Sequence, residues 1–120
     1  MVETTKKQYD LEERTFEFAR DARSFVRGLP QTVCNVEDVK QLVRATGSVG
    51  ANYIEANEAL SKKDFVMRVK ICRKEAKESR FFLRLLFTAD KKDLDGQRAD
   101  LVQEATELMN IFGAIYRKSE

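Results

Sequence analysis

Residues 65–86 place apolar or small side chains at alternating spacings of four and three residues. This is the repeat of one face of an α-helix, whereas a strand repeats its faces every two residues. The same spacing recurs in three other segments, so the sequence predicts four helices, over about residues 11–27, 36–59, 62–89 and 96–117. The stripe from 65 to 86 consists of Phe65, Val69, Cys72, Ala76, Ser79, Leu83 and Leu86.

Capping signals support these helices. Asp10 stands three residues before Glu13, and Ser61 stands three residues before Asp64, which is the spacing of a helix N-cap and its acidic partner. We take Asn35 as the N-cap of the second helix and residues 93–96 as a turn before the fourth. Long helices joined by short loops make chain neighbours antiparallel. The predicted fold is therefore all-α, an antiparallel up-down-up-down four-helix bundle forming a single domain over residues 1–120.

Composition excludes several kinds of site. The chain has no histidine, which removes the commonest general base and metal ligand, and neither Cys34 nor Cys72 belongs to a C-x-x-C pair. We therefore expect no metal, no cofactor, no catalytic residues and no enzymatic activity. The segment MVETTKKQYDLEER lacks the apolar core of a signal peptide, and no run of about 18 apolar residues is present. We expect a cytoplasmic protein with no membrane partner and with reduced thiols.

The segment of residues 36–59 carries two adjacent apolar rows rather than one. The first row is Val39, Leu42, Thr46, Val49, Tyr53, Ala56 and Leu60, and the second is Val43, Gly47, Gly50, Ile54 and Asn57. The end of the third helix, FFLRLLF, is also almost wholly apolar. Because soluble monomers rarely expose large apolar patches, we predict a homo-oligomer with Phe81, Phe82 and Phe87 as interface anchors. In the alternative interpretation, the broad helix faces form one thick core within a single subunit.

Two glycines lie inside the second predicted helix. Gly47 and Gly50 each cost about 1 kcal/mol of helix stability relative to alanine. With Ser48 and Ala51 they leave a stretch of helix with little side-chain bulk, which another helix or a large aromatic ring can approach closely. We predict that Gly47, Gly50 and the neighbouring Tyr53 belong to a close-packing seam between helices or subunits.

The run TGSVGANYIEAN, followed by SKKDF, resembles the family of four-helix bundle proteins encoded within intervening sequences of bacterial 23S rRNA genes. The later run KEAKES and the leucine-rich stretch after it are also similar to that family, and the resemblance covers about residues 15–90. The matching positions are Ser48, Ala51, Asn52, Glu55, Ser61, Lys62, Asp64 and Phe65.

The resemblance implies a four-helix bundle that associates into a ring-like homopentamer. It also implies a distant relative by fold, the accessory variability protein of diversity-generating retroelements, a basic pentamer that works with a reverse transcriptase and nucleic acid. The partners that follow from the resemblance are further copies of the chain, RNA or DNA, and a reverse transcriptase. It implies no enzymatic activity.

The third predicted helix concentrates positive charge. The chain as a whole has 22 basic and 20 acidic residues, a net charge of +2, yet residues 61–88 hold nine basic residues against three acidic ones. Five of the nine recur every three or four residues and form what we call the basic ladder: Lys70, Arg73, Lys77, Arg80 and Arg84. At 1.5 Å per residue the ladder is about 21 Å long, enough to meet several phosphates of a nucleic acid. We predict that it binds nucleic acid or a nucleic-acid enzyme.

Other interpretations of these residues stay open at the level of sequence. The basic ladder can be a solvated face whose charges pair with acids of the same or a neighbouring subunit, in a structural assembly protein that binds no nucleic acid. Phe81 and Phe82 can stack on bases, although packing is the commoner role of adjacent phenylalanines. Glu55 and Glu58 lack the histidines of a di-iron bundle site. We expect Asn52 and Glu55 to bond to basic residues across the hairpin instead.

Overall fold

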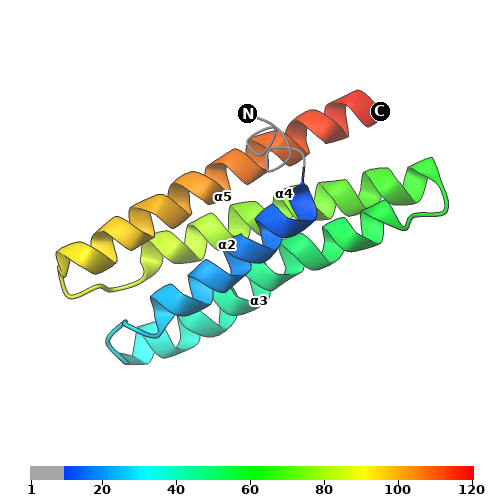
Figure 1. Cartoon of the computed structure of the whole chain (residues 1–120). Coiled ribbons are helices and arrows are strands. Elements are labelled where there is room, and N and C mark those ends of the chain that lie inside the picture. The colour runs from blue at the N-terminus through cyan, green and yellow to red at the C-terminus, as the bar shows by residue number, and fades with distance from the viewer. Residues whose placement is uncertain (1–9) are drawn as a thin grey trace.

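The computed structural model describes residues 10–120, and residues 1–9 of the predicted domain lie outside this range. Four helices follow one another: α2 (Leu11–Val26), α3 (Val33–Asn57), α4 (Lys62–Leu85) and α5 (Lys92–Ser119). Short loops make each helix antiparallel to the next in an up-down-up-down four-helix bundle (Figure 1). In the described part of the chain, α2 packs on α3, α3 on α4 and α4 on α5, and α2 also meets α5. The predicted fold class is confirmed.

The core consists of one inward stripe from each helix. On α4 the predicted stripe from Val69 to Leu83 is fully buried, and Cys72 is a buried thiol within it. Large side chains from the other three helices meet this stripe, and each is at most 2% exposed: Phe18, Phe25, Leu42, Val49, Leu108 and Phe112. Burial of a large apolar side chain contributes about 1.5–3 kcal/mol, so the core formed by these side chains and the α4 stripe is the main source of stability.

Two predicted caps are present. The backbone N–H of Glu13 donates to the Asp10 carboxylate over 3.1 Å, and that of Asp64 donates to the Ser61 hydroxyl over 3.1 Å. Each bond satisfies an N–H that the first turn of a helix would otherwise leave without a partner.

The predicted start of the second helix is wrong by three residues, since α3 begins at Val33. The hydroxyl of Thr32, not Asn35, caps it by accepting from the Asn35 N–H over 3.1 Å. Asn35 is 2% exposed and joins two loops at one end of the bundle. Its Nδ2 donates to the Pro30 and Phe87 carbonyls, and its Oδ1 accepts from the Phe87 N–H, at 2.8–2.9 Å. The loops after α2 and α4 are thereby fixed to each other.

The boundary between the third and fourth helices also differs from the prediction. Helix α4 ends at Leu85 rather than near residue 89, because Leu86 is extended and both Ala89 and Asp90 have positive φ. Helix α5 begins at Lys92, four residues before the predicted start, so Gly96 lies inside it. Asp93 and Asp95 occupy its first turn, where negative charge favours a helix N-terminus. The turn-like run KKDLDG is therefore a helix start.

Candidate nucleic-acid interface

Two acids of helix α4, Glu75 and Glu78, lie on a different flank from the basic ladder. Glu75 and Glu78 face α3, where both carboxylates accept from Nη2 of Arg44, at 3.2 and 2.6 Å. Glu75 is 5% exposed and Glu78 is partly buried. The acids thus neutralise a cation of α3, while the basic ladder lies on the other flank, next to α5.

Contacts with α5 place individual members of the basic ladder. Arg73 lies beside Gly113, where a Cβ atom would stand 3.5 Å from the arginine Nε. Nη1 of Arg80 donates to the Thr106 hydroxyl over 3.3 Å. The Arg80 guanidinium is therefore held on α5 by a neutral partner, and Arg73 lies along the same α4–α5 seam.

The other three members of the basic ladder are exposed, as Arg73 is. Nζ of Lys70 stands 5.7 Å from the ring centroid of Tyr116, a cation–π distance, and Lys70, Lys77 and Arg84 are all exposed. Within residues 10–120, no member of the basic ladder lies within 4.0 Å of a carboxylate, although other arginines of the chain do. Pairing of the ladder with acids of the same subunit, one of the interpretations open from sequence, is therefore absent from the described structure.

Apolar side chains accompany the basic ladder on the outer surface of α4. Phe81 is 55% exposed, and Leu85 and Met67 are also exposed. Phe82 instead packs against the core and meets Phe81 edge to face, with the ring centroids 5.2 Å apart and the planes at 84°. Of the predicted interface anchors, Phe81 and Phe87 are thus on the surface and Phe82 is largely used within the subunit.

A second exposed apolar cluster lies at the loop end of the bundle. Phe87 is half exposed, and its backbone is bonded to Asn35, which stands between the exposed Val33 and Val36. We call Val33, Val36 and Phe87 the apolar end cluster. Sequence spacing alone did not reveal it, because the bond between Asn35 and Phe87 joins residues 52 positions apart.

The glycine pair faces α2. A Cβ atom on Gly50 would stand 3.0 Å from Thr15 Oγ1 and 3.3 Å from Thr15 Cβ, and one on Gly47 would stand 3.3 Å from an Arg23 nitrogen. Arg23 in turn donates to the Val43 carbonyl over 3.3 Å. The two glycines of the second apolar row therefore pack on α2 within one subunit, as the thick-core interpretation requires, whereas Ile54 of the same row stays 50% exposed.

Residues of the sequence signature contact one another, α4 and α5. Tyr53 packs on Phe112, with ring centroids 5.6 Å apart. Asn52 Nδ2 donates to the carbonyl and hydroxyl of Ser48, both over 2.9 Å, and its Oδ1 accepts from Arg68 over 3.0 Å. The predicted cross-hairpin bond is confirmed for Asn52. Glu55 is exposed and has no such bond within residues 10–120.

A cleft of about 820 Å³ opens between α2 and α5. Phe18, Phe25 and Leu101 contribute its apolar lining. Its acidic lining residues are Glu17, Asp21, Asp100 and Glu104. Sequence reasoning missed this acidic cleft, although the signal was present: each of the two helices carries a pair of acids four residues apart. Helices far apart in sequence had to be placed side by side before the four carboxylates formed one site.

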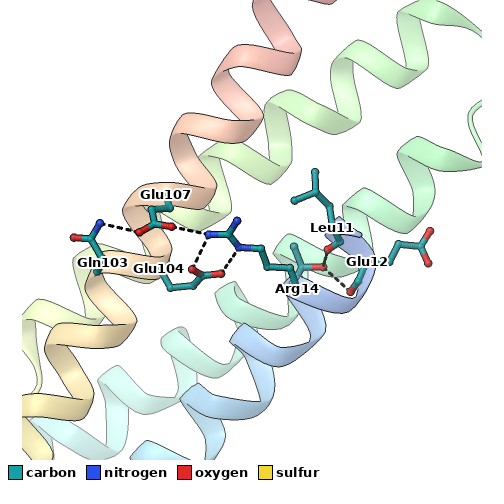
Figure 2. Close-up of polar contacts among 7 residues, drawn as sticks. Leu11, Glu12, Arg14, Gln103, Glu104 and Glu107 are labelled. Carbon is teal, nitrogen blue, oxygen red and sulfur yellow. Dashed lines mark hydrogen bonds and ion pairs between the residues drawn. The ribbon is translucent and has the colours of Figure 1, made fainter. Parts of the chain in front are cut away.

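One ion-pair network bridges the cleft. Arg14 donates to both oxygens of Glu104, over 2.7 and 2.9 Å, and to Glu107 over 2.7 Å, while Gln103 donates to Glu107 over 2.9 Å (Figure 2). Hydrogen bonding to Glu104 is the main cause that raises the pKa of Arg14. Bonds from Gln103 and then Arg14 lower the pKa of Glu107. The network ties α2 to α5 in the charged state.

Replacing Arg14 with methionine tests this bridge. The side chains of Arg14 and Glu104 are only 17% and 28% exposed, so we expect a loss of about 1–2 kcal/mol in the free energy of unfolding at pH 7. The pKa of Glu107 is lowered in the folded protein, so the contribution of Glu107 to stability is present at neutral pH. That contribution is lost as the pH falls through the lowered pKa. Urea unfolding from pH 7 downward measures both effects.

Arg20→Met is the matched control for this experiment, since Arg20 pairs with Asp21 at 57% exposure on both sides. It should change stability by no more than about 0.5 kcal/mol. Equal losses in the two variants, or a loss in Arg14→Met that stays constant into acid, would contradict the assigned role of the bridge.

The buried thiol carries no chemistry at neutral pH. Burial raises the pKa of Cys72 to about 12, and its Sγ lies 3.4 Å from the Val49 carbonyl, to which it donates. Because the thiolate is the reactive form of cysteine, Cys72 acts as a small core residue. Cys34 is exposed and free.

Comparison with known proteins adds a family. A family model described as "23S rRNA-intervening sequence protein" matches residues 7–114. A crystal structure of a protein with unknown function from the S23 ribosomal protein family of Bacteroides thetaiotaomicron is similar in fold, with a TM-score of 0.73 and 27% sequence identity. The match covers 88% of this chain and 96% of that one. No curated protein sequence matches. Within residues 10–120, no helix is long and apolar enough to cross a membrane.

Proposed function

The chain belongs to the 23S rRNA-intervening sequence protein family, and from this premise we propose that it is a non-enzymatic homo-oligomer that binds nucleic acid through the basic ladder. The observation that carries the proposal is the row of five cations on one flank of α4 with no carboxylate partner among residues 10–120. An uncompensated row of this kind concentrates positive potential in a chain whose total charge is only +2.

The dimensions of the basic ladder suit a phosphate backbone. From Lys70 to Arg84 it extends about 21 Å along the helix axis. Each phosphate that a lysine or arginine neutralises releases condensed counterions, so affinity falls as salt rises. Nothing in the geometry selects bases by hydrogen bonding, and we propose recognition of backbone charge and shape for RNA or DNA.

For the oligomer, we propose the apolar end cluster as a subunit contact. Val33 is 84% exposed, Val36 43% and Phe87 53%, and together they form an apolar surface that contact with a neighbouring subunit would remove from water. The resemblance to the family suggests a pentameric ring and, through the retroelement accessory protein, a reverse transcriptase as a further partner. In such a ring each copy contributes one basic ladder.

A second candidate function, structural assembly without nucleic acid, is favoured by the acidic cleft. Two of its lining acids already pair within the subunit, Glu104 with Arg14 and Asp21 with Arg20. The cleft as a whole still combines acidic with apolar lining, which complements the cations and exposed Phe81 of the basic ladder. Helices α2 and α4 are diagonal in the bundle, so the ladder can enter only the cleft of another copy. A contact between two different surfaces repeats from copy to copy, and it forms a ring when the rotation between copies closes.

Titration of the unmodified protein with fluorescently labelled RNA and DNA, at low and moderate salt, tests the proposal. We expect binding at low salt that weakens by at least tenfold at moderate salt, in line with several phosphate contacts. Light scattering on the same samples gives the oligomeric state. No binding even at low salt would contradict the first function and leave the assembly function, while a monomer would contradict both.

A further inference from the structure

We propose that the basic ladder selects single-stranded over duplex nucleic acid, with the exposed ring of Phe81 as a platform on which a base stacks. This inference rests on the proposed nucleic-acid binding and names the class of ligand. It starts from Phe81, an exposed aromatic ring beside the ladder.

Phe81 lies among the cations rather than apart from them. It follows Lys77 by four residues and precedes Arg84 by three, and these are the spacings at which helical side chains are surface neighbours. All three are exposed, and Phe81 keeps 55% of its surface open to solvent. Glu78, three residues before Phe81, is also a neighbour, but its carboxylate accepts from Arg44 of α3 over 2.6 Å. A ligand that meets this part of α4 therefore meets an aromatic ring between two cations that have no carboxylate partner within residues 10–120.

The ring of Phe81 is also supported. Phe82, which packs against the core, meets it edge to face with centroids 5.2 Å apart. That contact limits the orientations of the Phe81 ring, so less freedom is lost when a flat ligand covers it. Leu85, four residues further on and 52% exposed, extends the apolar surface along the same side.

Single strands and duplexes bind to such a surface in different ways. A duplex keeps the faces of its bases stacked inside, so it offers Phe81 only sugar and phosphate. A single strand can turn a base onto the ring while its phosphates lie on the flanking cations, the combination found in proteins that bind single strands without sequence preference. The same five charges therefore bind the two forms unequally.

The test compares the whole protein, Phe81→Ala and Phe16→Ala on labelled single strands of about 12 nucleotides and on duplexes of the same sequence. Phe16 is the matched control, being 57% exposed but on α2, diagonal to α4. We expect the unmodified protein to prefer the single strand, and Phe81→Ala to lose about tenfold in single-strand affinity with duplex affinity unchanged. Phe16→Ala should match the unmodified protein on both ligands.

Each other outcome separates the two proposals. If the unmodified protein binds neither ligand, the proposed function fails and this inference fails with it. If it binds the duplex as tightly as the single strand, or if Phe81→Ala keeps full single-strand affinity, the inference alone is overturned. If Phe81→Ala changes the molar mass in light scattering, Phe81 is a subunit contact, which also overturns the stacking role.

Discussion

Replacing Arg73 and Arg80 together with glutamate should lower nucleic-acid affinity by on the order of 100-fold at low salt, while the oligomer keeps its size. The two arginines are central members of the basic ladder, and neither has a carboxylate partner within residues 10–120. Reversal removes two phosphate contacts and adds two repulsions. The slope of log affinity against log salt should also become shallower, by about 2 for a duplex.

Lys62→Glu with Lys63→Glu is the control for this result. Both lysines are exposed at the first turn of α4, so the double change alters net charge equally but spares the basic ladder. The nucleic-acid affinity of this control variant should fall much less than that of Arg73→Glu with Arg80→Glu. An equal loss in both variants would mean that net charge, not the ladder, governs binding. Loss of the oligomer in Arg73→Glu with Arg80→Glu would instead support the assembly function, in which the ladder enters a neighbouring cleft.

Gly50→Leu should lower the free energy of unfolding by about 3 kcal/mol. A Cβ at Gly50 would stand 3.0 Å from Oγ1 of Thr15, whose side chain is buried and bonded to the Leu11 carbonyl over 2.7 Å. Thr15 cannot rotate away without losing that bond, so the leucine has to be accommodated by a shift between α2 and α3. Urea unfolding measures the loss, and light scattering shows whether assembly is lost as well.

Two other glycines provide the controls for Gly50→Leu. A Cβ atom at Gly96 would have no neighbour within 4 Å. Gly96→Ala should therefore raise the free energy of unfolding by up to about 1 kcal/mol through helix propensity. Gly47→Ala meets only the far end of the Arg23 side chain, which can shift, so its change should be small. If Gly50→Leu kept the stability and size of the unmodified protein, close packing of α2 on α3 would not be the role of this glycine.

The positions of the helices could be predicted well where local chemistry decides them. Asp10 and Ser61 cap their helices as expected, since a cap bond joins residues three apart. Prediction failed at Asn35, whose local sequence is that of a cap. Its partners Pro30 and Phe87 belong to two different loops, and only the folded chain brings them together.

The candidate sites divide in the same way. The basic ladder follows from helical spacing, because its members lie on one helix, and so does its place beside the core stripe. Its place beside α5 is known only from the structure. The absence of carboxylate partners in the described chain does not follow, since the docking of α3 and α5 decides which side chains face each flank of α4. Only after docking does Arg44 of α3 meet Glu75 and Glu78. The acidic cleft likewise needs α2 beside α5.

By itself, the sequence determined the four helices, their antiparallel order, the core stripes and the basic ladder, since each depends on the helical repeat or on bonds between near neighbours. Only the tertiary structure decided that Gly50 lies against Thr15, that Phe82 is packed on the core while Phe81 stays open, and that four acids form one cleft. These are relations between surfaces of different helices. The rotation and separation of packed helices depend on how all their side chains fit together, and that fit is a property of the whole bundle.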